Sequence, residues 1–246
     1  IMEDDKRVAF GMYFNENEPL NIVLNDLFEH YRQHVADVDK ITKALFENAV
    51  VQSQADIVND HIAFRTLGVP NLGIASFEKI FFALGYTRKD YFNFEGKKLN
   101  AYWYAPPSPQ YPRIFVSELR VEELSIAAQD IIYKYTADIQ ADPVDALDLH
   151  NGVEVASFLQ TPLWGIPTSG EYKRLLAESE YAAWVMYNRY YLNHYTISIH
   201  ELIAGYNTLE EFNDFLYRIG IKMNTSGGVI KTSADGLLRQ SSTVSA

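Results

Sequence analysis

The chain has 246 residues, of which 48% are hydrophobic and 22% charged, so it is long and apolar enough to build a core. Its formal net charge of −11 argues against nucleic acid as a partner, because phosphate binding needs clustered lysine and arginine. The absence of cysteine excludes disulfides, thiolate metal sites and cysteine nucleophiles.

Membrane and export signals are not expected. No stretch approaches the roughly 20 apolar residues of a membrane-spanning helix. Residues 1–10 carry a run of charged side chains and lack the apolar centre of a signal peptide. We therefore expect a cytoplasmic protein with no membrane partner.

The first predicted elements are helices at residues 20–35 and around 41–46, followed by a strand at 61–67. Ser76 is the predicted N-cap of a helix that Gly85 ends. Three further strands are predicted at 86–94, 99–104 and 113–119. This order, β-α-β-β-β, defines a first module.

The middle of the chain is predicted to be helical. An amphipathic helix is expected at 121–135 and another at 171–187, with an acidic, irregular connection between them through Asp148. A strand then begins at His194, and Thr208 caps a helix that ends at Gly220.

The second strand–helix unit repeats the first. Aligned on Gly85 and Gly220, the apolar positions of the two helices coincide: Phe77 with Phe212, Ile80 with Phe215, Phe81 with Leu216, and Leu84 with Ile219. Any two strand–loop–helix units share some periodicity, which is the competing interpretation. We favour a repeat because both strands begin with histidine.

His61 and His194 are therefore candidate metal ligands. Two imidazoles and one carboxylate leave open coordination positions on a divalent metal, an arrangement that suits iron(II) and, on ligand type alone, zinc or manganese. Taken singly, each would more readily be interpreted as a core histidine.

Arg65 shares a strand face with His61, because side chains two and four apart point the same way. Its planar guanidinium could bind a substrate carboxylate through two hydrogen bonds, or it could form a structural salt bridge. Glu118 is a candidate third ligand at a strand end; otherwise it caps the next helix or pairs with Arg120.

The remaining histidines are not expected to be ligands. His200 lies roughly 20 Å from His194 by strand rise. His30 and His34 are predicted on an exposed helix face, and His150 in a solvated loop.

Four segments together resemble the DUF1338 family, which includes the 2-oxoadipate dioxygenase/decarboxylases, also called 2-hydroxyglutarate synthases. They are 59–66 (NDHIAFRT), 112–119 (PRIFVSEL), 193–196 (NHYT) and 224–228 (NTSGG). The resemblance runs from about Leu20 to Ala246. It implies an iron(II) centre of two histidines and one glutamate, in which His61 and His194 match the histidines and Arg65 matches the arginine that holds the far carboxylate. The family's glutamate comes from a strand after residues 240–243, hence beyond Ala246.

The resemblance further implies an α+β fold of the vicinal-oxygen-chelate type, with two β-α-β-β-β modules forming a curved sheet. We expect one domain: helices at 20–58, a first module at 59–120, a helical insertion at 121–190, and a second module at 191–246 that is incomplete at its C-terminus. The implied reaction uses O2 to convert a 2-oxo dicarboxylic acid such as 2-oxoadipate to a 2-hydroxy acid with loss of CO2, a step in lysine catabolism. The alternatives are a metal-dependent hydrolase or isomerase on the same scaffold, and a metal-free small-molecule binding module.

Overall fold

The computed structural model describes residues 18–233 and 236–244, so residues 1–10, where no signal peptide is expected, lie outside the described part. The described residues form two compact units. One contains residues 28–58, 197–233 and 236–244, and the other contains 18–27 and 59–196. The border at 58/59 coincides with the predicted start of the first module.

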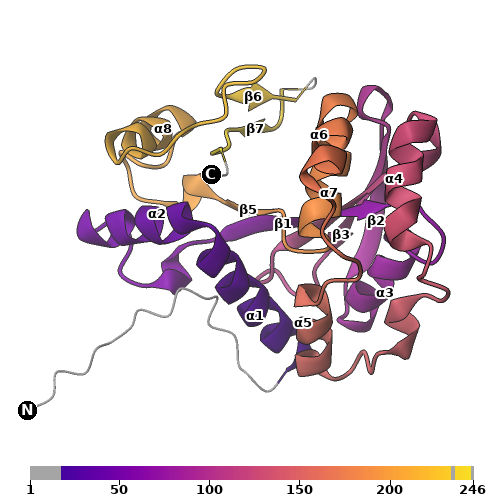
Figure 1. Ribbon diagram of the computed structural model, residues 1–246. Coiled ribbons are helices and arrows are strands. Elements are labelled where there is room, and N and C mark those ends of the chain that lie inside the picture. Colours follow the sequence, from indigo (N-terminus) through magenta and orange to yellow (C-terminus); the bar gives the residue numbers. More distant parts are fainter. Residues whose placement is uncertain (1–17, 234–235, 245–246) are drawn as a thin grey trace, which may run out of the picture. The chain divides into compact units, whose positions relative to one another are not determined.

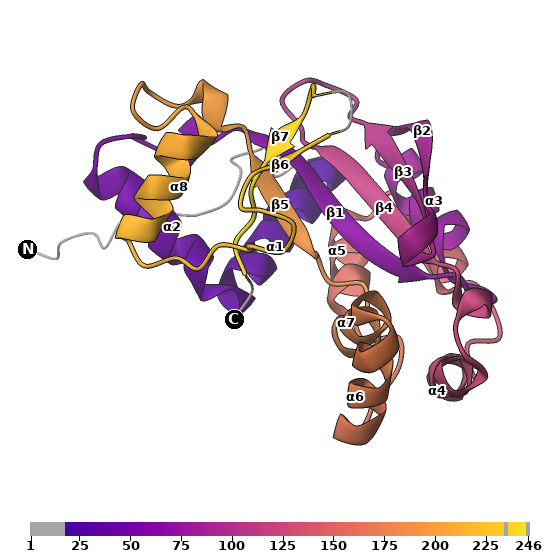
Figure 2. The ribbon, with the colours of Figure 1, turned by 90° about the horizontal axis from the view of Figure 1, so that it is seen from above.

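The unit of residues 59–196 is built on a mixed five-stranded sheet in the order β2-β3-β4-β1-β5, seen from above in Figure 2. The strands are β1 (Asn59–Leu67), β2 (Thr87–Phe94), β3 (Leu99–Ala105), β4 (Arg113–Leu119) and β5 (His194–Ile197), of which the last contributes residues 194–196 to this unit. β1 and β4 are parallel, whereas β3 runs antiparallel to both β2 and β4. The protein is therefore of the α+β class.

One face of this sheet forms an apolar core with α3 (Ile74–Ala83). Phe64 of β1 lies 5.1 Å from Phe77 and 5.5 Å from Phe81 between ring centroids, and all three are almost completely buried. Burial of a phenylalanine side chain contributes about 1.5–3 kcal/mol to stability. This face of the sheet therefore stabilises the fold and is not open to a ligand.

β2 is one of the two outer strands of the sheet, and all eight of its residues are exposed. Its pairing with β3 shifts register between Arg88 and Tyr91. The aromatic side chains Tyr91, Phe92 and Phe94 remain open to solvent.

The other helices of this unit differ in part from the sequence prediction. They are the first part of α1 (Pro19–His34), α4 (Ile126–Thr136), α5 (Gly152–Gln160), α6 (Ser169–Glu178) and α7 (Glu180–Asn188), as Figure 1 shows. The single helix predicted at 171–187 is two helices, because Ser179 adopts an extended backbone (φ −147°) and its hydroxyl accepts from Ala182 N–H to cap α7. None of the described helices is long and apolar enough to cross a membrane.

Two other predictions were wrong in detail. α3 begins at Ile74 rather than after Ser76, whose hydroxyl donates to Asp142 instead of capping the helix. The predicted helix at 121–135 is a short 3-10 turn, Val121–Glu123, followed by α4. α5 lies where no helix was predicted.

The second unit contains α2 (Ala36–Glu47), α8 (Leu209–Arg218) and the two-residue strands β6 (Lys231–Thr232) and β7 (Arg239–Gln240). Its core joins α2 and α8 through residues such as Leu45, Phe215 and Leu216. Among the described residues, the second β-α-β-β-β module is not formed. β5 ends at Ile197, and His200 lies in the 3-10 turn Ile199–Glu201 rather than on a strand.

The predicted repeat is visible at the ends of α3 and α8. Gly85 and Gly220 follow these helices with φ of 90° and 75°. Tyr86 N–H donates to Phe81 C=O and Ile221 N–H donates to Leu216 C=O, both over 2.9 Å. The two helices thus end in the same glycine-dependent motif.

We predict that Gly85→Ala and Gly220→Ala each lower the free energy of unfolding by about 1–2 kcal/mol, because a Cβ is disfavoured at positive φ. Urea unfolding would measure the loss. Gly96→Ala is the matched control, since Gly96 is not among the positive-φ residues and a Cβ there would meet no heavy atom within 4 Å. Equal effects of all three substitutions would contradict the prediction.

Candidate metal and substrate site

The structure brings His61 and His194 together on adjacent strands. Their ring centroids are 5.6 Å apart in an edge-to-face arrangement. Asn193 N–H donates to Ala63 C=O over 2.9 Å, which holds the start of β5 beside β1. The Phe115 ring, 5.1 Å from His61, forms an apolar wall next to the pair.

The electrostatic surroundings favour a neutral His194. Desolvation by the surrounding protein, together with electrostatic repulsion from His61 and Arg65, lowers the pKa of His194 to about 4, although the residue keeps an exposed edge. A neutral imidazole has a free lone pair at neutral pH and is the form that binds a metal.

Both rings are held at Nδ1 by the residue that precedes them in the chain. Asp60 Oδ2 lies 2.8 Å from His61 Nδ1, and Asn193 Oδ1 lies 2.7 Å from His194 Nδ1. The sequence prediction overlooked Asp60 and Asn193; their position directly before each candidate ligand was the available signal. With Nδ1 occupied, Nε2 is the remaining ligand atom of each ring, and two imidazoles suit a divalent transition metal. At His61 this atom lies 3.0 Å from the Thr196 hydroxyl, which would have to turn away for a metal to bind.

Arg65 lies on the same face of β1, stacked against two aromatic rings of α7. Its guanidinium carbon is 5.0 Å from the Tyr181 ring centroid and 5.1 Å from the Trp184 ring centroid. Burial lowers the pKa of Arg65 from its usual value, although arginine at this site remains charged. Within the described part of the chain Arg65 forms no salt bridge, so the structural role considered from sequence is not observed.

Tyr181 is itself fixed by hydrogen bonds to the sheet. Its hydroxyl contacts Ser117 Oγ at 2.8 Å and accepts from Thr66 N–H at 3.1 Å. Neither Tyr181 nor Trp184 could be assigned to the site from sequence, because both lie more than a hundred positions from Arg65 and carry no motif.

The structure places Glu118 on the opposite face of the sheet from His61. The β1–β4 register places Glu118 opposite Thr66, on the face that packs against α3 and away from His61. Its Oε2 accepts from Ile74 N–H over 2.8 Å, at the N-terminus of α3. Arg120, its other predicted partner, pairs with Glu123 at 2.6 Å.

The two candidate ligands therefore lie together without a visible third. Among residues 18–233 and 236–244, no group of three histidine, aspartate or glutamate side chains is arranged to hold a metal. The two histidines and the stacked arginine on one sheet face nevertheless form a site suited to a metal and an acidic small molecule.

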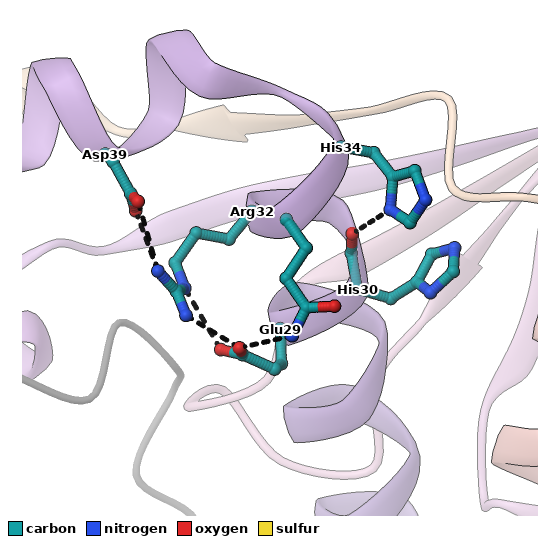
Figure 3. Close-up of polar contacts among 6 residues, drawn as sticks. Glu29, His30, Arg32, His34 and Asp39 are labelled. Carbon is teal, nitrogen blue, oxygen red and sulfur yellow. Dashed lines mark hydrogen bonds and ion pairs between the residues drawn. The ribbon is translucent and has the colours of Figure 1, made fainter.

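The other histidines lie outside this site. His30 and His34 lie side by side on α1, their rings tilted by 31° with centroids 4.2 Å apart, and His34 Nδ1 lies 2.7 Å from His30 C=O. Figure 3 shows them beside Arg32, which pairs with Glu29 at 2.6 Å and Asp39 at 3.1 Å. His34 is exposed as predicted, whereas His30 is half-buried; His150 and His200 are exposed.

The chain resembles known proteins over most of its length. Over residues 23–246 the chain matches the family model described as 2-oxoadipate dioxygenase/decarboxylase. It is 45% identical over 199 residues to the chloroplastic 2-oxoadipate dioxygenase/decarboxylase of Arabidopsis thaliana, covering 75% of this chain and 51% of that protein. The crystal structure of the hydroxyglutarate synthase of Oryza sativa in complex with 2-oxoadipate has a TM-score of 0.80 and 35% identity, with 95% of this chain and 75% of that chain covered.

A Ralstonia eutropha protein named for the glyoxalase superfamily shares the fold alone, with a TM-score of 0.69 and 20% identity over 94% of this chain and 77% of that chain. The chain thus has an α+β fold that it shares with that protein. More narrowly, the chain belongs to the 2-oxoadipate dioxygenase/decarboxylase family. It spans about half the length of the curated relatives it matches, whose chloroplastic names give the expected cytoplasmic location no support.

We predict that Glu118→Ala lowers the free energy of unfolding by about 1–3 kcal/mol, because Ile74 N–H loses its acceptor. Urea unfolding measures the loss. Cobalt(II) binding, followed by calorimetry, should be unchanged from the unsubstituted chain. If a folded Glu118→Ala variant lost cobalt binding, Glu118 would be a metal ligand and the prediction would be wrong.

Proposed function

We propose that this protein is a non-haem iron(II)-dependent dioxygenase/decarboxylase that converts a 2-oxo dicarboxylic acid, of the 2-oxoadipate kind, to a 2-hydroxy acid with loss of CO2. The observation that carries the proposal is the placement of His61, His194 and Arg65 on one face of the sheet. Family membership and the 2-oxoadipate in the rice relative's structure support it.

His61 and His194 would hold the metal through Nε2, leaving coordination positions for substrate and O2. The resemblance assigns the third position to a glutamate. When bound, iron(II) would supply oxygen activation and orientation of the 2-oxo acid. Phe115 keeps one side of the histidine pair apolar, which limits access of water to the reacting groups.

Arg65 would bind the substrate's far carboxylate. The guanidinium is flanked by Tyr181 and Trp184, whose faces hold its plane in place by cation–π contact. Arg65 is partly desolvated and has no carboxylate partner in the described residues. A carboxylate that accepts two hydrogen bonds from its guanidinium would therefore bind strongly. Arg65 lies four residues from His61, roughly 13 Å along the strand, which the arginine side chain and a short dicarboxylic acid can bridge.

Metal analysis combined with oxygen uptake on 2-oxoadipate tests the proposal. We expect stoichiometric iron and iron-dependent uptake with release of CO2. Metal without uptake would favour a hydrolase or isomerase on this scaffold, and absence of bound metal would favour a binding module. His61→Ala should abolish metal binding; retention of stoichiometric metal would overturn the ligand assignment.

Arg65→Ala should raise the apparent Kd for 2-oxoadipate about 10–100-fold, because a charge-assisted hydrogen bond contributes about 1.5–3 kcal/mol. Metal content should stay unchanged, since Arg65 is not a ligand. Lys89→Ala is the control, because Lys89 is an exposed cation on β2. An unchanged affinity in Arg65→Ala would remove Arg65 from the substrate site.

A further inference from the structure

The two candidate ligands share a feature beyond their identity: a side-chain oxygen of the preceding residue faces Nδ1 of each ring. Resting on the proposed function, we propose that Asp60 and Asn193 are positioning residues. They fix both histidines as the Nδ1–H tautomer, so that both Nε2 atoms point their lone pairs at one metal.

The contacts of His61 determine its tautomer. The Asp60 carboxylate can only accept, so the proton shared over 2.8 Å belongs to His61 Nδ1. Nε2 then carries the lone pair, and the Thr196 hydroxyl, 3.0 Å away, donates to it. The side chain of His61 is only 14% exposed, so solvent competes little for either nitrogen.

Arg113 holds the Asp60 carboxylate in place. The β1–β4 pairing sets Arg113 opposite His61, and its Nη1 donates to Asp60 Oδ1 over 3.1 Å while Oδ2 faces the imidazole. With side chains 53% and 33% exposed, this ion pair contributes little to stability. Its effect is to orient the carboxylate.

His194 has the same arrangement with a neutral acceptor. Asn193 Oδ1 accepts from Nδ1 over 2.7 Å, while the backbone N–H of Asn193 is tied to β1. A carboxylate increases the basicity of an imidazole ligand more than an amide does. The two histidines are therefore unequal donors, and His61 is the stronger.

Tautomers can be read directly in the metal-free chain by long-range ¹H–¹⁵N NMR of ¹⁵N-histidine-labelled protein, with peaks assigned by His61→Asn and His194→Asn. We expect Nδ1–H for both residues. Asp60→Ala should release His61 toward the Nε2–H form, whereas Asp60→Asn, which keeps an oxygen acceptor, should retain Nδ1–H. Asp90→Ala is the control, because Asp90 accepts from Trp103 on the same sheet and contacts neither histidine.

Cobalt(II) titration of the same variants provides the second measurement. Asp60→Ala should weaken binding about 10–100-fold, as expected for loss of an outer partner of a ligand. Asp60→Asn should weaken it less. Asp90→Ala should leave it unchanged.

An Nε2–H form of His61 in the unsubstituted chain, or an unchanged tautomer and cobalt affinity in Asp60→Ala, would overturn the inference. Failure of the proposed metal centre has a different signature. In that case His61→Ala would keep full cobalt binding, while the tautomers of the metal-free chain would still report on Asp60 and Asn193.

Discussion

The pairing of β1 with its neighbours is the constraint on which the site depends. Alternation along β1 sends Ile62 and Phe64 into the core with α3, and His61 and Arg65 to the opposite face. Shifting this register by one residue would exchange the two sets. The burial energy that stabilises the core therefore also keeps the polar residues on the site face.

Sequence patterns predicted the elements that depend on local order. β4 spans the predicted residues 113–119, and the glycines after α3 and α8 adopt the positive φ that the helix-end pattern requires. The proximity of His61 and His194 also followed from sequence, because the repeat placed each at the start of a strand. Their role as metal ligands stays a prediction.

What sequence patterns missed was decided by contacts between distant segments. Ser179 interrupts an otherwise helical pattern because its hydroxyl caps α7. Glu118 was assigned by its place at a strand end, yet its orientation depends on the N-terminus of α3, more than forty residues earlier. Tyr181 and Trp184 reach Arg65 only through the packing of α7 against the sheet, which no periodicity of either segment reveals.

The exposed outer strand β2 has a consequence for the behaviour of the protein in concentrated solution. An open strand edge bearing Tyr91, Phe92 and Phe94 is a template on which a second chain could add a strand and begin aggregation. The register shift between Arg88 and Tyr91 interrupts the regular edge, and the charged side chains of Lys89 and Asp90 lie within the irregular stretch. The same irregularity that weakens pairing inside the sheet thus protects the protein from joining sheets with its copies.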